Sequence, residues 1–387
     1  MKTSVSPIRV LATLFGITIA FATLGCSSPT NSTPAAVTIP LIGGNVNSTV
    51  SLPGYWSNGT WNQLDLPTGE TNAEVNAITA SGSKIYAAGN AWITTTTPDL
   101  NVPGYWLNGT WTSLPLPTTG QTNGIVNDIV VSGTNVYAAG DCWVTTTVPY
   151  PTIPGYWLND NWTPLTLSTG ETNGEVYGLV IAGSNIYAVG ESGTSSTSTP
   201  GYWLNGTWTA LNPPSGAVDG VANKAVVSGS NVYVSGYSWN SSNNVDAPGY
   251  WINGTWTALP LPTGATSGNA YSIVVSGSNV YVGGQGVTGT GATAVYSPLY
   301  WTNGTLTSLP VPSADAGGGW VNRIAISGSN IIAIGGCAVT ASFTSVNIPG
   351  YWLNGTWTPL PVPSADTNGG YASSAASSQS MPSHFKP

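Results

Sequence analysis

Charged residues are scarce in this chain of 387 residues. They make up only 5% of it, against about a quarter of an average soluble protein. Two of the six basic residues, Lys2 and Arg9, lie in the first 25 residues, so the remainder carries four basic and 14 acidic residues. An acidic surface repels phosphate groups, which excludes nucleic acid as a partner and argues against docking on anionic lipid through the protein surface.

Histidine and cysteine are almost absent as well. The single histidine, His384, lies in the stretch 381–387, which is expected to be a disordered tail. A Ser-His-Asp hydrolase therefore has no base, and zinc or copper sites that need histidine have no ligands. Cys142 and Cys337 hold equivalent places in two distant repeats, so we expect buried or half-buried thiols without a disulfide. No metal and no cofactor is expected.

Long apolar runs are limited to Val10–Leu24, which is short for a membrane span. With basic residues before the run and small residues after it, residues 1–25 have the three parts of a secretory signal peptide. The run ends in Thr23-Leu24-Gly25-Cys26, which resembles the lipobox of bacterial lipoproteins, although Thr23 replaces the usual aliphatic residue. The resemblance implies a lipidated Cys26 and a flexible tether over residues 26–36.

A signal peptide followed by a lipidated Cys26 predicts a protein of the bacterial cell envelope, at the outer membrane or cell surface. It would contact the membrane only through its lipid anchor. If Cys26 is not lipidated, the leader is an ordinary signal peptide and the protein is secreted.

Glycine and large aromatic residues are abundant, with 49 Gly, 17 Trp and 18 Tyr. The chain is too apolar for disorder and too rich in turn formers for helices, which favours an all-β fold. A Tyr-Trp pair recurs with its Tyr at positions 55, 105, 156, 202, 250, 300 and 351. Between these pairs a strand ends in Gly at positions 89, 140, 190, 236, 284 and 335.

Each repeat of about 50 residues reads as four short strands, which predicts a β-propeller. The first two strands are typified by Ser272–Val275 and Val280–Val282, the third by Gly-Tyr-Trp and the fourth by Thr-Trp-Thr. The pattern resembles the kelch repeat, in which a strand ends in Gly-Gly, here Gly283-Gly284 or Gly335-Gly336, and Tyr and Trp follow, here Tyr351 and Trp357. It is also similar to an uncharacterised bacterial surface family with YWxNG and VSGSxVYVxG repeats.

The repeat spacing predicts seven four-stranded blades within residues 37–380, closed by strands from both termini. Ile39–Gly44 aligns with Ile331–Gly336 as a second strand, and Ser374–Ser378 would replace Arg323–Ser327 as the missing first strand. The alternative is six blades with frayed ends.

The recurrent Asn-Gly pair predicts a type I′ hairpin between the third and fourth strands. Such a turn places two Trp side chains directly opposite each other, where they pack closely. The predicted pairs are Trp56 with Trp61, Trp106 with Trp111, Trp157 with Trp162, Trp203 with Trp208, Trp251 with Trp256, and Trp352 with Trp357. The Asn-X-Thr pattern in the motif is then a consequence of the turn and not a glycosylation signal.

Meander topology places all long connections on one face, which is the candidate ligand face. Trp92, Trp143 and Trp239 recur there three residues after the strand-ending Gly, with Tyr150 and Tyr237 nearby. These Trp side chains either pack on the next blade or stack against sugar rings or a partner.

Two carboxylate pairs also fall in these connections. Glu70 with Glu74 and Glu171 with Glu175 are solvated loop residues or calcium ligands, and they match no established calcium loop. The sequence therefore predicts a monomeric, non-catalytic binding or scaffold module for a glycan or a protein partner. The alternative is a carboxylate-based glycoside hydrolase or polysaccharide lyase.

Overall fold

The computed structural model describes residues 37–93, 100–118, 120–144, 151–194, 196–217, 219–240, 245–340, 346–363 and 368–376. All of them belong to one compact unit, Val37–Pro387. The helical content of the described residues is one short 3-10 turn, η1 (Gly291–Thr293). In this part of the chain no helix has the length and hydropathy needed to cross a membrane.

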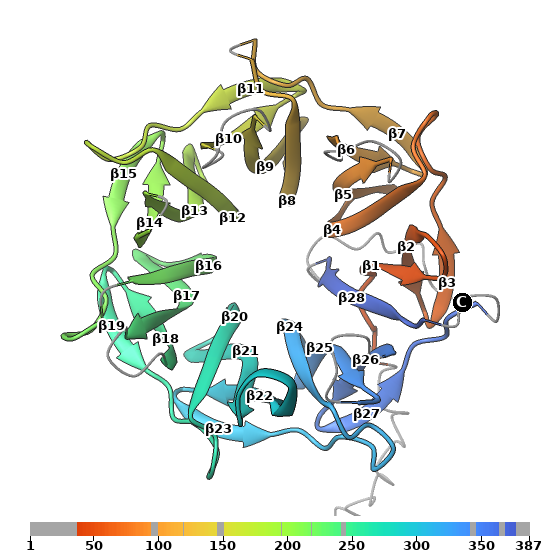
Figure 1. Cartoon of the computed structure of the whole chain (residues 1–387), viewed down its shortest axis with the longest axis vertical. Coiled ribbons are helices and arrows are strands. Elements are labelled where there is room, and N and C mark those ends of the chain that lie inside the picture. The colour runs from red at the N-terminus through yellow and green to blue at the C-terminus, as the bar shows by residue number, and fades with distance from the viewer. Residues whose placement is uncertain are drawn as a thin grey trace, which may run out of the picture. The chain divides into compact units, whose positions relative to one another are not determined.

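Each repeat forms an antiparallel meander whose strands follow one another from the centre of the unit outwards (Figure 1). The inner strands are β4 (Asn72–Ser81), β8 (Asn123–Ser132), β12 (Asn173–Ala182), β16 (Asp219–Ser228), β20 (Ser267–Ser276), β24 (Gly318–Ser327) and β28 (Gly370–Ala375). The second strands are β1 (Ile42–Asn47), β5 (Lys84–Trp92), β9 (Asn135–Trp143), β13 (Asn185–Gly193), β17 (Asn231–Asn240), β21 (Asn279–Thr288) and β25 (Asn330–Ala338).

The outer half of each meander carries the Tyr-Trp motif. The third strands are β2 (Ser51–Ser57), β6 (Asn101–Leu107), β10 (Thr152–Leu158), β14 (Ser198–Leu204), β18 (Val245–Ile252), β22 (Val295–Thr302) and β26 (Asn347–Leu353). The outer strands are β3 (Thr60–Gln63), β7 (Thr110–Ser113), β11 (Asn161–Pro164), β15 (Thr207–Ala210), β19 (Thr255–Ala258), β23 (Thr305–Ser308) and β27 (Thr356–Pro359).

These strands make the unit an all-β propeller of four-stranded antiparallel sheets, as the repeat predicted. The described strands form five separate four-stranded sheets and one eight-stranded sheet, in which a parallel pairing of Tyr296 with Gly318 joins β22 to β24. The number of sheets equals the predicted number of blades only if the two halves of the eight-stranded sheet are counted separately.

Strands from the two ends of the unit share a sheet, in the order β28-β1-β2-β3. Tyr371 faces Asn45 as Trp320 faces Gly336, so Tyr371 takes the place of Trp320. The predicted alignment of Ile39–Gly44 with Ile331–Gly336 is wrong by one residue. Gly44 pairs with Gly54 on the third strand, and the residue that makes the equivalent pair, with Gly350, is Gly335 and not Gly336. The adjacent glycines at each site allowed this slip.

The inner and second strands are longer than the runs that typify them in the sequence, Ser272–Val275 and Val280–Val282. β20 and β21 span ten residues each, and their pairing continues beyond Gly284 through Gln285 to Val287. Polar and glycine residues can extend a strand here because β21 has a partner on both sides, β20 and β22.

The hairpin motif has the predicted turn geometry. Asn108 and Gly109 have φ angles of 49° and 89°, the two positive values of a type I′ turn. Trp106 faces Trp111, with ring centroids 4.4 Å apart and tilted by 57°. The inner Trp of each such pair is almost completely buried, while the outer one is half-buried.

The inner Trp also joins neighbouring sheets, a role that the sequence did not reveal. Its indole N–H donates to a backbone carbonyl in the connection that follows the preceding outer strand, at 2.7–2.9 Å. The acceptors are Pro361 for Trp56, Asp65 for Trp106, Pro115 for Trp157, Thr166 for Trp203, Asn212 for Trp251, Pro260 for Trp301 and Pro310 for Trp352. The bond from Trp56 to Pro361 links residues 305 positions apart and so crosses the junction between the two ends of the unit.

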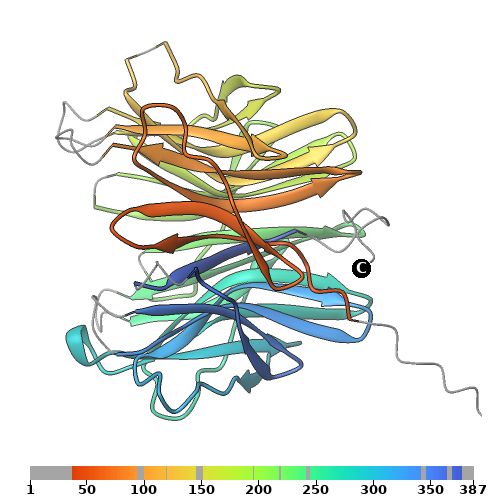
Figure 2. The same ribbon diagram turned by 90° about the vertical axis from the view of Figure 1, so that its right-hand side faces the viewer.

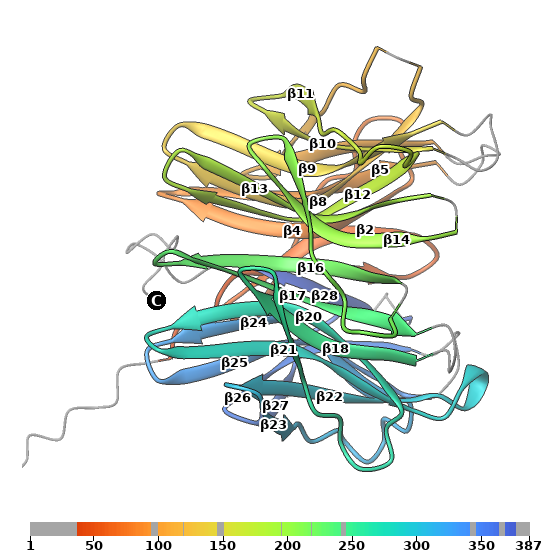
Figure 3. The ribbon, with the colours of Figure 1, turned by 90° about the vertical axis from the view of Figure 1, so that its left-hand side faces the viewer.

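The two kinds of connection lie on opposite faces of the unit. The turns from inner to second strands and from third to outer strands are tight, and we call their side the tight-turn face. The connections from second to third strands lie on the other side, the long-loop face, where η1 protrudes (Figures 2 and 3).

Candidate functional site

The aromatic residues expected on the long-loop face lie at strand ends. Trp92 and Trp143 are the last residues of β5 and β9, and Trp239 is the last but one of β17. All three are half-buried, as is Tyr237 in β17. Tyr150 lies outside the described residues.

The polar surroundings of the three Trp residues differ. Trp92 faces Asn72 and Asn101 on the adjacent strands. Trp143 likewise faces an Asn and a Thr, Asn123 and Thr152.

Trp239 is flanked by carboxylates on both sides, Asp219 in β16 and Asp246 in β18. Of these three positions, Trp239 is therefore the one where an aromatic ring adjoins two acidic side chains.

Around Trp239 the structure forms a cavity of about 290 Å³, which we call the acidic pocket. Strands of two neighbouring sheets contribute to it, β13 and β14 in one and β16, β17 and β18 in the next. Its lining residues are Glu191, Ser198, Asp219, Gly220, Val221, Tyr237, Trp239 and Asp246.

Protonation of these carboxylates is favoured by their surroundings. Burial, together with the charges of Glu175 and Asp219, raises the pKa of Glu191 to about 7, although a hydrogen bond with Ser198 lowers it. Burial also raises the pKa of Asp219 and of Asp246. The acidic pocket thus holds three carboxylates that are poorly solvated and do not all ionise readily.

The acidic environment continues toward the centre of the unit. Glu175 accepts a hydrogen bond from the hydroxyl of Tyr177 at 2.5 Å. Burial and the charge of Glu175 raise the pKa of Asp141 well above its ordinary value. Within the described residues, no three His, Cys, Asp or Glu side chains are placed to hold a metal ion.

The two members of each predicted Glu pair have different surroundings. Glu74 lies in β4 opposite Asn90, and burial raises its pKa despite hydrogen bonds from Asn76 and Asn90. Glu70 precedes β4, and its pKa is raised by burial. Glu171 accepts a hydrogen bond from Ser192 and Glu175 accepts one from Tyr177, whereas one carboxylate oxygen of Glu70 is buried without a hydrogen-bond partner among the described residues.

The two cysteines of the repeats are buried and not disulfide-bonded. Burial raises the pKa of both thiols, Cys142 and Cys337, which keeps them protonated and unreactive. Cys26 lies outside the described residues.

The sequence reasoning missed a group of charged residues at the centre of the unit. Asp128, Lys224 and Arg323 hold the same position in three inner strands, where the other inner strands have Ala77, Gly178, Ser272 or Ser374. This position has a small or polar residue in the other inner strands, and the chain has few charges. An alignment of the inner strands would therefore have shown three charged residues at one position as a signal.

Comparisons with known proteins give structural likeness alone. No family model and no curated protein matches the sequence. Among solved structures, the chain is similar to YCF48 bound to D1 peptide, with a TM-score of 0.41 and 12% identity over 79% of this chain and 91% of that one. For the structure of YjhT the TM-score is 0.38 and the identity 11%, over 74% and 95% of the two chains.

A third similar structure is an exo-1,5-alpha-L-arabinanase from a bovine ruminal metagenomic library, with a TM-score of 0.35 and 10% identity over 64% of this chain and 99% of that one. Likeness at this level does not distinguish an enzyme from a binding protein.

Proposed function

We propose that the protein is a non-catalytic binding module of the bacterial cell envelope and that it binds a glycan in the acidic pocket. The observation that carries this proposal is the presence of Trp239, Tyr237 and three carboxylates in one cavity of about 290 Å³. A volume of that size suits one sugar unit of a longer chain, with the neighbouring units outside the pocket.

Each part of the pocket has a role in sugar recognition. The apolar face of a pyranose stacks on an indole ring, here that of Trp239. Carboxylate oxygens of Asp219 and Asp246 accept hydrogen bonds from neighbouring hydroxyl groups, because ionised carboxylates are strong acceptors. The acidic lining repels anionic sugars, so the expected ligands are neutral or basic glycans.

Glycan arrays followed by calorimetry on the purified full chain test this proposal. Trp239→Ala should weaken binding by about tenfold or more, because the stacking platform is lost. Trp92→Ala is the matched control, since Trp92 occupies a similar strand end beside Asn72 and Asn101. Absence of binding to every glycan, or equal losses in the two variants, would contradict glycan binding at this pocket; reproducible crosslinking of one envelope protein would instead support a protein partner.

We propose that a lipid anchor on Cys26 holds the protein at the membrane and is its only membrane contact. The propeller itself is a monomer. Replacing Cys26 by Ser should release the protein from the membrane fraction, because the acyl chains that hold it would not be attached. Fractionation and immunoblotting measure this. A Cys26→Ser protein that stays in the membrane fraction would rule out the anchor.

One observation favours a second candidate, a carboxylate-based glycoside hydrolase or polysaccharide lyase. The pKa of Glu191 is raised to about 7, which suits a general acid at neutral pH, and the charge of nearby Glu175 contributes to the shift. Hydrolysis or elimination of a bound glycan that is lost in Glu191→Gln but kept in Glu70→Gln would favour this candidate. Binding without turnover in the native protein would favour the binding module.

A further inference from the structure

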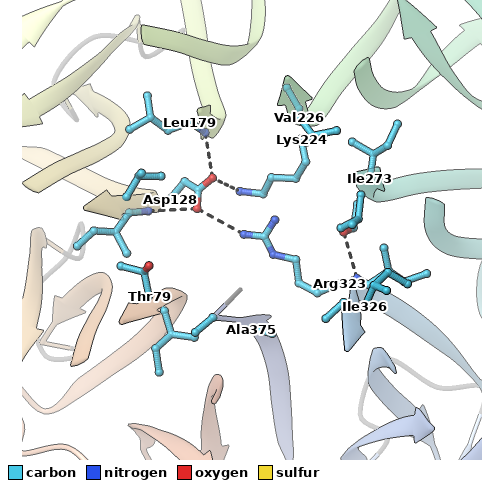
Figure 4. Close-up of a pocket in the computed structure, with 18 of the residues that line it drawn as sticks. Thr79, Asp128, Leu179, Lys224, Val226, Ile273, Arg323, Ile326 and Ala375 are labelled. Atoms are coloured by element: carbon cyan, nitrogen blue, oxygen red, sulfur yellow. Dashed lines mark hydrogen bonds and ion pairs between the residues drawn. The ribbon is translucent and has the colours of Figure 1, made fainter. Parts of the chain in front are cut away.

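A second cavity lies at the centre of the unit, away from the acidic pocket. It measures about 490 Å³, and the C-terminal halves of the inner strands line it as far as the residues beside the tight turns, such as Ala80, Val131 and Ser276. We call it the channel cavity (Figure 4). A solute would reach it from the tight-turn face.

Three charged side chains converge at its inner end. The ammonium group of Lys224 lies 3.0 Å from one carboxylate oxygen of Asp128, and the guanidinium of Arg323 lies 3.4 Å from the other (Figure 4). They come from β16, β8 and β24, so the contact spans the channel between non-adjacent inner strands. The side chains keep only 11–18% of their exposure.

The hydrogen-bonding capacity of Asp128 is largely used within the protein. One carboxylate oxygen accepts the backbone N–H of Leu179 at 2.9 Å, and the other accepts that of Ile129 at 3.1 Å. Burial disfavours the ionised carboxyl, but the charges of Lys224 and Arg323 and the hydrogen bonds from Leu179 and Lys224 lower its pKa below the ordinary value. Asp128 is therefore ionised and supplies one negative charge.

Two cations share that single negative charge. Among the residues that line the channel cavity, Asp128 is the one acidic side chain, which leaves the group with one uncompensated positive charge. Burial and the charge of Arg323 lower the pKa of Lys224 to about 8, as expected for a cation that lacks full compensation. A buried unpaired charge is costly, and an anion from solution would relieve that cost.

Arg323 has donors to offer such an anion. Its guanidinium carries five N–H groups and, among the described residues, donates one hydrogen bond, to Asp128. The ammonium of Lys224, by contrast, bonds both Asp128 and the backbone carbonyl of Tyr177. Arg323 therefore has more unused donors than Lys224, whose ammonium group adds a second positive charge.

The walls of the cavity favour an anion that carries an apolar part over an inorganic ion. Aliphatic side chains line it, together with the open backbone edges of the inner strands; they include Ile78, Ile129, Val226, Ile273, Ile324 and Ile326. The volume is within the range of small-molecule sites. We propose that the channel cavity binds a small organic carboxylate, whose anionic group pairs with Arg323 and Lys224 and whose apolar body contacts the aliphatic walls.

Calorimetry on the purified full chain, with hexanoate and its neutral analogue hexanamide as probes, tests this proposal. Hexanoate should bind and hexanamide should bind at least about tenfold more weakly, because the charged hydrogen bonds to Arg323 are lost. Arg323→Gln should weaken hexanoate binding by about 10- to 100-fold. Lys84→Gln is the matched control, because it removes an exposed cation at the start of β5 and changes the net charge equally.

Asp128→Asn adds a test that does not depend on loss of function. Without the competing carboxylate, Lys224 and Arg323 lose the anionic partner that they share, so hexanoate should bind more tightly than to the native protein. Crystals soaked in bromide should show an anomalous peak beside Arg323 that is absent in Arg323→Gln. Equal affinities for hexanoate and hexanamide, equal losses in Arg323→Gln and Lys84→Gln, or weaker binding by a folded Asp128→Asn variant would each overturn the proposal.

Discussion

At the scale of single residues, the repeats contain an internal comparison that explains the Gly of the Gly-Tyr-Trp motif. In the repeat of Gly104, a Cβ atom would lie 2.3 Å from Cζ2 of Trp111, so the indole ring requires glycine beneath it. In the repeat with Leu306 at the outer position, the glycine is replaced by Leu299, which is fully buried. The two positions therefore compensate each other in size: a large Trp on the outer strand goes with Gly on the third strand, and the smaller Leu306 goes with the larger Leu299.

This compensation in size predicts the behaviour of two substitutions. Gly104→Leu should lower the free energy of unfolding by about 1–3 kcal/mol, because the added side chain displaces Trp111. Combined with Trp111→Leu, it should recover part of that loss, because the double variant reproduces the native pair Leu299 and Leu306. Urea denaturation of the two single variants and the double variant measures the coupling. Additive losses would show that the two positions do not compensate each other in size.

The raised pKa of Glu191 predicts a pH dependence of stability. The unfolded carboxyl titrates near its ordinary value of 4.5 and the folded one at about 7, so the folded state binds more protons between these values. The contribution of Glu191 to stability is therefore lost as the pH rises through this window. Glu191→Gln should stabilise the protein by about 1–3 kcal/mol at about pH 8 and change little at about pH 4.

Urea denaturation at both pH values checks this result, with Glu70→Gln as a comparison outside the acidic pocket. A stabilisation of equal size at both pH values would mean that ionisation of Glu191 is not its cause.

At the scale of elements, the inner strands are joined by a recurrent contact. Their register shifts by one residue at an Asn in four cases, and that Asn donates from its side chain to a backbone carbonyl of the next inner strand. The four pairs are Asn76 with Val126, Asn127 with Val176, Asn223 with Ala270, and Asn322 with Ala372, at 2.9–3.1 Å. At Tyr177 the link to β16 is instead made by Lys224.

Removing one of these contacts should weaken the join between two inner strands. Asn223→Ala should lower the free energy of unfolding by about 1 kcal/mol, because the buried carbonyl of Ala270 loses its donor. Asn161→Ala is the control, since Asn161 is exposed and bonds only nearby carbonyls of its own turn. Chemical denaturation of both variants compares them, and equal losses would contradict a special role for the Asn at the register shift.

The sequence predicted these elements unevenly. Asn-Gly turns and opposed Trp residues lie close together in the chain, so local spacing predicts the third and outer strands and their pairing. The hydrogen bonds from Asn223 to Ala270 and from Trp106 to Asp65 join different repeats, so no local sequence pattern predicts them. The acidic pocket could not be predicted from spacing either, because Glu191, Asp219 and Asp246 come from two sheets.

At the scale of the whole unit, both ends of the described chain meet in one sheet. β28 pairs with β1 from Val46 opposite Gly370 to Ile42 opposite Ala375, and the N–H of Asn47 donates to Gly369 at 2.8 Å. The sequence of β28, Gly-Tyr-Ala-Ser-Ser-Ala, contains no β-branched residue, so it has little strand propensity of its own. Contacts outside its own sequence support it, including the bond from Asn322 to Ala372 and the packing of Tyr371 against Trp320.

This arrangement predicts the effect of removing the last inner strand. Deleting residues 368–387 should leave β1 as an open edge, so the amide of Asn47 loses its acceptor and should exchange with solvent on the order of 100-fold faster or more. Deleting residues 377–387 alone keeps β28 and should leave that amide protected. Hydrogen exchange measured by mass spectrometry on peptides spanning β1 distinguishes the two proteins. If β1 stayed equally protected in both, β28 would not be what closes the propeller, and the alternative of a ring with frayed ends would gain support.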